Sequence, residues 1–316
     1  MTEHLQLPEI IDSSTLSSFR SCKRKYFWST INSLTPKGSS IHLIAGAAFA
    51  AGIEHARRAA FSTDRILSVD EMLEIALPPF LKEWGNFVSR DNDKKTKEAM
   101  FNALRMYLTE YHPREDIIQP YIKGDGTPAV EFTFTIPLPI NHPETGNPFL
   151  FVGRFDMLGL YNGLPCIVDE KTTSQLGSAW SNQWALRGQF MGYTWACKQL
   201  GIDVQATVIR GIGIYVRDVK FQTAMEQYPD YLLARWYNQL LVDLNEIVSR
   251  YEVWKNGGKD ETMYPFTFGD ACTSYSGCPF VELCKVQDPE PFFSNFNHYR
   301  WNPLAKAPIE EVETGA

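Results

Sequence analysis

The sequence feature that most constrains the fold is a tight turn, Asn162-Gly163, between two stretches that read as β-strands, residues 149–161 and 164–172. Asn-Gly is the dipeptide most typical of a two-residue hairpin turn, because both of its residues tolerate a positive φ. The length of such a turn also sets the register of the strands that it joins. We therefore predict an antiparallel pair at the centre of the chain.

The chain before this hairpin has a helical pattern. Ser13-Ser14-Thr15 is an N-cap signal that opens the first predicted helix. The predicted helices cover residues 14–30, 44–61, 70–89 and 94–111. Pro113 and the turn sequence Gly124-Asp125-Gly126 end this helical part.

The pattern then changes to that of a sheet. Residues 130–136 alternate as a strand does, and the hairpin follows. A helix is predicted over 178–200, a strand over 205–216 and a long helix over 228–255. The resulting order of helix, three strands, helix and strand predicts a mixed α/β fold. We expect a helical region 1–125, a core 126–220 and a C-terminal lobe 221–316, packed as one domain.

Composition excludes several classes of protein. Apolar residues make up 44% of the 316 and charged residues 21%, which is typical of a folded protein. The net charge of −7 argues against a purely electrostatic nucleic-acid binder. No apolar run reaches the ~18 residues of a membrane span, and the first ten residues lack a secretory signal. A cytoplasmic protein is therefore expected.

The hairpin strands carry side chains with catalytic potential. Asp169 and Lys171 share one face of their strand, Glu170 points to the other, and Asp156 lies across the hairpin. Two carboxylates can bind Mg²⁺ or Mn²⁺, which activates water and stabilises charge on a phosphate. A neighbouring lysine can orient the nucleophile or offset phosphate charge. By itself Asp-Glu-Lys is a weak signal, since charged residues are common near strand ends.

The sequences Gly153-Arg154-Phe155-Asp156 and Ile167-Val168-Asp169-Glu170-Lys171-Thr172-Thr173 resemble the RecB-like branch of the PD-(D/E)XK nuclease superfamily. The resemblance runs from about Ser13 to Cys284. It implies a restriction-endonuclease-like αβββαβ core with a mixed central sheet, an N-terminal helical insert and a cysteine-rich C-terminal lobe. It also implies metal binding by Asp156 and Asp169 and a catalytic Lys171.

The resemblance points to further site residues on two helices. The segment Gly46 to His55 is similar to the family's ligand helix, which makes His55 a candidate metal ligand, although two glycines leave its register open. Gln189 and Tyr193 match the family's Gln-x-x-x-Tyr pattern, and their spacing places both on one helical face, able to contact the active site or DNA. Glu131, on the strand before the hairpin, is a candidate supporting residue.

Four of the six cysteines suggest an inorganic centre. Cys272, Cys278 and Cys284 lie close together in the sequence, and Cys22 lies far upstream. Four thiolates suit a [4Fe–4S] cluster or a structural zinc, although zinc sites usually space their cysteines more tightly. The resemblance favours a [4Fe–4S] cluster that joins the chain ends. The other two cysteines, Cys166 and Cys197, are interpreted as core thiols.

DNA is the partner that the resemblance implies, single-stranded or with free ends. The basic residues Arg20, Lys23, Arg24 and Lys25 are candidate phosphate contacts, and a solvated charged face is an equally good interpretation. Seven aromatic residues are candidates for base stacking, although core packing suits most of them better: Trp28, Trp180, Trp184, Trp195, Tyr264, Phe266 and Phe268.

We thus expect a Mg²⁺- or Mn²⁺-dependent DNA exonuclease that acts in recombination, repair or end processing in a prokaryote or phage, with a helicase as a possible partner. The alternatives are a catalytically silent DNA-binding or assembly subunit and a zinc-stapled nuclease. The silent alternative predicts the loss of an acid or of the lysine, yet Asp156, Asp169 and Lys171 are all present.

Overall fold

The computed structural model describes residues 5–38, 40–90, 93–273, 277–300, 302 and 304. Its contacts divide the chain into two compact units. Segments 39–132 and 154–230 form the first, which we call the sheet unit, and segments 1–38, 133–153 and 231–313 form the second, which we call the cysteine unit. The three-part division expected from the sequence stays a prediction.

A seven-stranded mixed sheet has the order β1-β5-β6-β7-β8, with β3 and β4 also paired to β5. The predicted hairpin is β5 (Pro148–Tyr161) and β6 (Leu164–Thr173), with Tyr161 opposite Leu164. Asn162 and Gly163 have φ values of 50° and 79°, as this turn requires. β7 (Ala206–Ile214) runs parallel to β6, and β8 (Val219–Glu226) runs antiparallel to β7. The mixed α/β fold with a central mixed sheet is confirmed.

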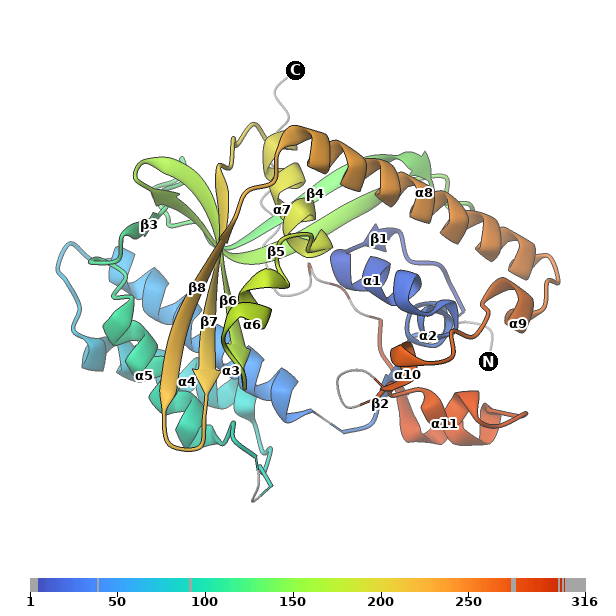
Figure 1. Ribbon diagram of the computed structural model, residues 1–316, viewed down its shortest axis with the longest axis horizontal. Helices are drawn as coiled ribbons and strands as arrows, with labels where there is room; N and C mark the ends of the chain where they lie inside the picture. Colours follow the sequence, from blue (N-terminus) through green and yellow to red (C-terminus); the bar gives the residue numbers. More distant parts are fainter. Residues whose placement is uncertain are drawn as a thin grey trace. The chain divides into compact units, whose positions relative to one another are not determined.

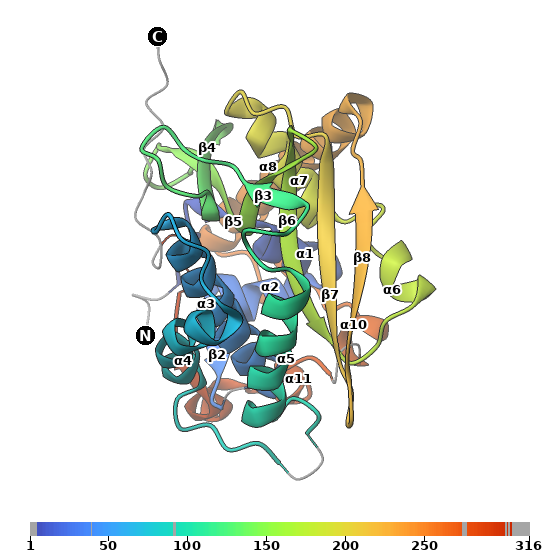
Figure 2. The ribbon, with the colours of Figure 1, turned by 90° about the vertical axis from the view of Figure 1, so that its left-hand side faces the viewer.

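Three helices cover one face of the sheet unit: α3 (Ile41–Phe61), α4 (Val69–Trp84) and α5 (Lys97–Glu110) (Figures 1 and 2). Their buried side chains form one core with Ile212, Ile214 and Val219 of the sheet. Gly52 allows α3 and α5 to approach closely, because a Cβ at this position would lie 2.6 Å from Leu104 Cδ2. Capping agrees with the predicted helices, since Ser68 and Glu71 form a capping box at the start of α4.

The opposite face carries α6 (Ser178–Asn182) and α7 (Gly188–Gln199) (Figure 1). The single helix predicted over 178–200 is therefore wrong, since the chain leaves the helix between these two segments. Arg187, immediately before α7, is extended at φ −75° and ψ 113°. The interruption buries Trp180 and Trp184, whose rings meet edge to face. On the sheet, Gly211 makes room for Trp180, because a Cβ there would lie 2.5 Å from its ring.

The cysteine unit begins with β1 (Ile10–Ile11), which runs parallel to the start of β5, and α1 (Ser13–Ser21). The predicted helix 14–30 is interrupted at Cys22, which is extended at φ −162° and ψ 116°. The chain re-forms a helix as α2 (Lys23–Tyr26), and a π-helix follows over Phe27–Ile31. The physical reason is a competing partner, because the Arg24 amide donates to the carbonyl of Pro265 at 3.2 Å.

The remaining elements of this unit are mostly C-terminal. The long predicted helix is α8 (Asp230–Lys255), and short helices follow. These are α9 (Asp260–Met263), α10 (Asp270–Thr273), α11 (Val281–Cys284) and a 3-10 helix over Glu290–Asn295. β2 (Leu34–Pro36) pairs with β9 (Phe296–His298). β4 (Val130–Asn141) and β5 pass from one unit to the other, and β3 (Ile118–Pro120) belongs to the sheet unit. No helix in the described residues is long and apolar enough to cross a membrane.

Candidate active site

The candidate site lies where the hairpin strands separate. The last backbone pair between β5 and β6 on this side of the turn joins Met157 to Val168. Beyond it the amide of Glu170 donates to Oδ2 of Asp156 at 2.6 Å, so a carboxylate replaces the backbone partner. The register also places Asp156 next to Asp169 across the hairpin. The structure thus brings together the two carboxylates that the sequence singled out.

Asp169 and Lys171 share a face of β6, as predicted. Asp169 is buried, and its Oδ1 forms an ion pair with Nζ of Lys171. Nζ of Lys171 also lies 5.9 Å from the ring centroid of Phe190 on α7. The ammonium of Lys171 is therefore paired with a carboxylate, and an aromatic ring lies near it.

Helix α7 carries two further predicted residues, Gln189 and Tyr193. The side-chain amide of Gln189 donates from Nε2 to the hydroxyl of Tyr193 at 2.9 Å, one helical turn away. The ring of Tyr193 lies 5.4 Å from that of Phe155, which precedes Asp156. Asp169, Lys171 and Asp156 all act electrostatically on Tyr193. Tyr193 therefore lies beside the carboxylates and Lys171, and Gln189 is hydrogen-bonded to it.

The pKa values at the site follow from crowding of buried carboxylates. Burial raises the pKa of Asp156 well above its usual range, and the charge of Asp169 raises it further. Burial also raises the pKa of Asp169, while Lys171 opposes that shift. Burial lowers the pKa of Lys171, but the charges of Asp169 and Asp156 outweigh it and leave the pKa raised. Two close acids with one ammonium leave excess negative charge, which a divalent cation would compensate.

Glu170 points to the opposite face of β6, as the alternation predicts. Its carboxylate accepts from the hydroxyl of Tyr107 at 2.6 Å and forms an ion pair with Arg57. Burial raises the pKa of Glu170, but Arg57 outweighs it and lowers that pKa to about 2. The three side chains are almost completely buried. This contact network was not foreseen from the sequence.

Helix α3 presents a different residue to the carboxylates than the one predicted. His55 is exposed, and its Nδ1 lies 2.9 Å from the carbonyl of Ala51 in its own helix. Glu54 instead lines a narrow cavity, too small for a water molecule, beside Asp156 and Glu170, while His55 does not. The lining residues are Ala50, Ile53, Glu54, Arg57, Val130, Glu131, Asp156 and Glu170. The role of His55 as a metal ligand stays a prediction, and Glu54 is a residue that the sequence reading missed.

Glu131 lies at the rim of the same cavity in an unusual backbone conformation. Its φ is 54°, in the left-handed region that few residues with a side chain adopt. Its carboxylate forms an ion pair with Arg154 at 2.9 Å. Burial raises the pKa of Glu131 to about 7, and Arg154 opposes this shift. The supporting role expected from the sequence fits this position and stays a prediction.

With this geometry established, the family can be assigned. The model of the PD-(D/E)XK nuclease superfamily matches residues 13–285. The chain belongs to the PD-(D/E)XK nuclease superfamily. Its carboxylates and lysine lie at the hairpin where the resemblance placed them. The narrower resemblance, to the RecB-like branch, stays a prediction.

Two further comparisons add no functional detail to the superfamily assignment. No curated protein matches this chain. Among solved structures, a crystal structure of SSO0001 matches over 65% of this chain and 87% of that chain. The sequence identity is 9% and the TM-score is 0.28.

The four cysteines predicted to hold a cluster all belong to the cysteine unit. The amide of Cys278 donates to the carbonyl of Cys272 at 2.9 Å. Burial raises the pKa of Cys278 and of Cys284, and Cys22 adds to both shifts. Cys22 and Cys272 therefore lie within electrostatic range of Cys278, and Cys22 and Cys278 lie within electrostatic range of Cys284. In the described part of the chain, no three His, Cys, Asp or Glu side chains lie close enough to hold a metal ion.

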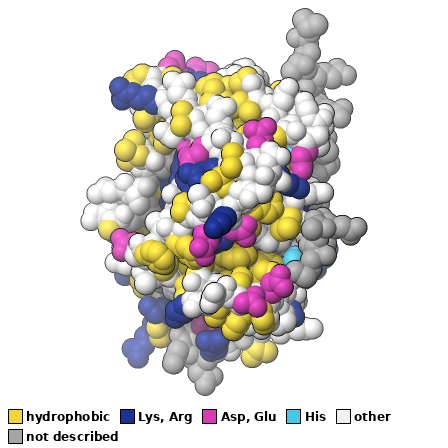
Figure 3. Space-filling model, turned by 90° about the vertical axis from the view of Figure 1, so that its right-hand side faces the viewer, with side chains coloured by type: hydrophobic (Ala, Val, Ile, Leu, Met, Phe, Trp, Pro, Cys, Tyr) yellow, Lys and Arg dark blue, Asp and Glu magenta, His cyan; other side chains and the backbone are white. Residues whose placement is uncertain are grey.

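The basic residues near Cys22 are largely paired or buried. Arg20 forms an ion pair with Asp243 at 2.6 Å, and Nζ of Lys23 lies 3.6 Å from the ring centroid of Phe19. Lys25 is half-buried. On the face drawn in Figure 3, basic side chains are scattered among acidic and hydrophobic ones. Their role in binding DNA stays a prediction.

Arg24 differs from its basic neighbours. It is 2% exposed and lies over the ring of Phe266 at 4.6 Å. Its Nε and one terminal nitrogen have no hydrogen-bond partner among the described residues. Burial lowers the pKa of Arg24, while nearby acids and the thiols of Cys284 and Cys22 oppose this shift. A buried guanidinium with unused donors beside thiols is the environment that an anionic centre would complete.

Most of the aromatic residues proposed for stacking are core residues, as the sequence reading favoured. Trp28, Trp180, Trp184, Trp195 and Tyr264 are buried. Phe268 is the exception, since it is 83% exposed and its ring stacks on that of Phe266 at an interplanar angle of 3°. Cys166 and Cys197 are buried core thiols, as predicted.

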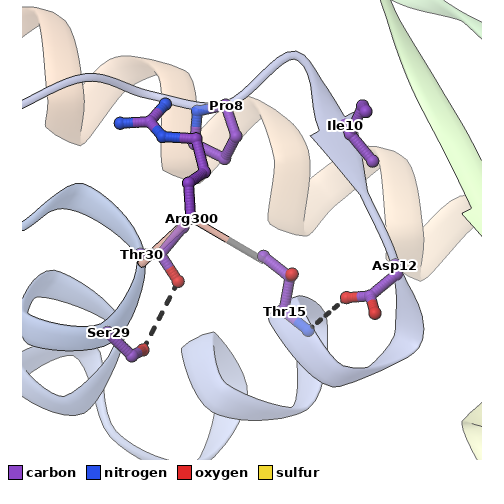
Figure 4. A pocket seen from close by; sticks show the side chains of 7 residues that line it. All are labelled: Pro8, Ile10, Asp12, Thr15, Ser29, Thr30 and Arg300. Atoms are coloured by element: carbon purple, nitrogen blue, oxygen red, sulfur yellow. Dashed lines mark hydrogen bonds between the residues drawn. The ribbon is translucent and has the colours of Figure 1, made fainter. Parts of the chain in front are cut away.

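The cysteine unit also contains a small polar pocket of about 40 Å³ (Figure 4). Arg300 reaches over it, and the hydroxyls of Ser29 and Thr30 lie 3.4 Å apart on its wall. Asp12 accepts from the amide of Thr15 and caps α1. The pocket holds no pair of acids, so it is not a second candidate for the catalytic site.

Proposed function

We propose that this chain is a Mg²⁺- or Mn²⁺-dependent DNA exonuclease. The observation that carries the proposal is the meeting of Asp156, Asp169 and Lys171 at the point where β5 and β6 separate. Membership of the nuclease superfamily supports phosphodiester hydrolysis as the reaction. Attack on free DNA ends, in recombination, repair or end processing, is the finer part of the proposal.

Each side chain of the site has a separate proposed role in hydrolysis. Asp156 and Asp169 would hold the cation through carboxylate oxygens, with water completing its coordination. When bound, the cation lowers the pKa of a water molecule and polarises the phosphate. Lys171 holds a positive charge beside the carboxylates, where it can stabilise charge on the phosphate or orient the attacking water. Tyr193 and Gln189 would contact the substrate beside these groups.

The test uses the full chain with end-labelled linear DNA and closed circular DNA. With Mn²⁺, linear DNA should be shortened and circular DNA should remain intact. Lys171→Ala should reduce the rate by at least a hundredfold, while Lys198→Ala, on the surface beside Asp230, should not. Equal cleavage by the wild type and Lys171→Ala would refute the catalytic assignment, and cleavage of circles would refute the exonuclease assignment.

We further propose that Cys22, Cys272, Cys278 and Cys284 hold a [4Fe–4S] cluster. The unused donors of Arg24 beside two of these thiols support an anionic centre there. Protein purified without oxygen should be brown and contain about four iron atoms per chain, and Cys284→Ser should lose them. Zinc as the sole bound metal would favour the zinc-stapled alternative and refute the cluster.

A further inference from the structure

We propose that Arg57 and Tyr107 are positioning residues for the proposed metal site, acting through Glu170 from the opposite face of β6. The inference rests on the proposed function and adds residues that lie outside the nuclease motif. Its basis is a continuous chain of hydrogen bonds that runs from the helices to a metal-binding carboxylate.

The first link holds the Glu170 side chain. Arg57 binds both carboxylate oxygens of Glu170, since Nη1 donates to Oε2 at 3.2 Å and Nη2 donates to Oε1. The hydroxyl of Tyr107 donates its proton to Oε1 at 2.6 Å. Because the Tyr107 hydroxyl has only one proton to donate, its oxygen accepts a hydrogen bond from Nη2 of Arg57 at 2.9 Å.

The second link makes the burial of these charges possible. Arg210 lies opposite Glu170 in the β6–β7 register and donates to the Tyr107 hydroxyl at 3.2 Å. Its guanidinium also forms a bidentate ion pair with Asp116, with N–O distances of 2.6 and 2.8 Å. Two arginines and two carboxylates leave no net charge in the network. Paired buried charges with directional hydrogen bonds restrict the geometry of the network, although Nε of Arg210 has no hydrogen-bond partner among the described residues.

The third link reaches the site. The amide of Glu170 donates to Oδ2 of Asp156 at 2.6 Å, so this residue is held at its side chain and at its backbone. The peptide that precedes it carries Asp169. Arg57 therefore fixes, through one residue, the separation of the two carboxylates that would bind the cation. A shift of a few tenths of an ångström at Glu170 changes that separation directly.

The experiment measures Mn²⁺ affinity by isothermal titration together with thermal unfolding. Arg57→Met should unfold at a lower temperature, because it leaves the Glu170 carboxylate buried and unpaired. In Arg57→Met/Glu170→Met the apolar pair should restore the unfolding temperature, yet the Mn²⁺ affinity should stay at least tenfold weaker than in the wild type. Recovery of both quantities would show a merely structural role and overturn the inference.

Two further variants keep the test decisive. Tyr107→Phe keeps the ring in the core and removes one hydrogen bond to Glu170, so a threefold or larger loss of Mn²⁺ affinity is expected, and unchanged affinity would count against the inference. Arg114→Met is the matched control, since Arg114 bonds backbone carbonyls of Ala60 and Thr63 instead of Glu170. It should lower stability and leave Mn²⁺ affinity unchanged. A wild-type chain that binds no Mn²⁺ would instead refute the proposed function itself.

Discussion

At the scale of single residues, the direction in which a side chain points decides its role more than its chemical type does. Glu54 and His55 are neighbours on α3, yet only Glu54 lines the cavity that contains Asp156. A sequence pattern identifies the helix but cannot settle which of two adjacent positions faces the sheet. The two glycines at Gly46 and Gly52 leave two possible registers.

This difference gives the first residue-scale prediction. His55→Ala should change Mn²⁺ affinity by less than threefold, because the side chain is exposed and bonded to its own helix. Glu54→Ala should weaken Mn²⁺ binding by a larger factor, since it removes a carboxylate from the cavity. Isothermal titration of both variants checks this. A tenfold loss for His55→Ala alone would instead establish the histidine as a ligand.

Lys95 gives a prediction on pH. Burial lowers its pKa to about 8, and its ammonium donates to the carbonyl and the hydroxyl of Thr172 at 3.1 and 3.0 Å. Below pH 8 the folded chain therefore keeps a buried charge, which costs up to about 3 kcal/mol relative to the unfolded chain. As the pH rises from 8 to 10.5, the unfolded state binds more protons and this cost disappears.

The stability of the wild type should accordingly rise across this pH range relative to Lys95→Met. The measurement is urea unfolding of both chains at pH 7.5 and pH 10.5. Lys94→Met, at the exposed neighbouring position, should follow the wild type at both values. A difference between the wild type and Lys95→Met that does not change with pH would contradict the buried charge.

At the scale of elements, local signals predicted the hairpin well. Asn162-Gly163 set the register of β5 and β6, and with it the meeting of Asp156 and Asp169. The two uninterrupted helices predicted over 14–30 and 178–200 were wrong, because the breaks in them depend on contacts with residues outside the local sequence pattern. The break at Cys22 follows from a bond to Pro265, and the break between α6 and α7 accompanies burial of Trp184. β8 was not predicted, although its first four residues, Val219 to Gln222, alternate between apolar and polar side chains.

The turn gives a prediction with a built-in control. Gly163→Ala should lower the free energy of unfolding by about 1 kcal/mol, because φ is 79° and a Cβ is strained there. Gly46→Ala should raise it by about 0.5–1 kcal/mol, since that helical position has open space and an ordinary φ. Urea unfolding measures both. Equal effects of the same sign would contradict the assigned turn.

The loop before α10 gives a prediction on DNA binding. Phe268 offers one free ring face, with Phe266 stacked on the other side and Arg24 beyond it. Base stacking on an aromatic ring contributes about 1–3 kcal/mol. Phe268→Ala should therefore weaken binding of single-stranded DNA at least fivefold, measured by fluorescence anisotropy. Tyr231→Ala, another exposed aromatic position in the cysteine unit, should not, and an equal loss in both would refute stacking.

At the scale of the whole molecule, the two proposed centres lie in different units. The carboxylates and Lys171 belong to the sheet unit, and the four cysteines belong to the cysteine unit. Short sequence motifs suggested both proposed centres, and both stay predictions. The sequence did not predict the division between them or the Arg57 network, because these depend on contacts between residues far apart in the chain.

This division predicts independent failure of the two centres. Cys22→Ser should abolish iron binding and lower the unfolding temperature of the chain. It should change the Mn²⁺ affinity of the carboxylate site by less than threefold, because no cysteine of the centre lies in the sheet unit. Iron analysis and isothermal titration on the same sample decide this. Simultaneous loss of both metals would show that the centres are coupled.

The passage of β4 and β5 from one unit to the other has a consequence for dissecting the protein. The start of β5 is covered by the C-terminal part of the chain, since the ring of Phe151 lies 5.3 Å from that of Trp236 on α8. A fragment that stops before residue 231 would retain every proposed catalytic side chain and still expose this aromatic surface to water. Such a fragment should aggregate, so neither half can be obtained by simple truncation.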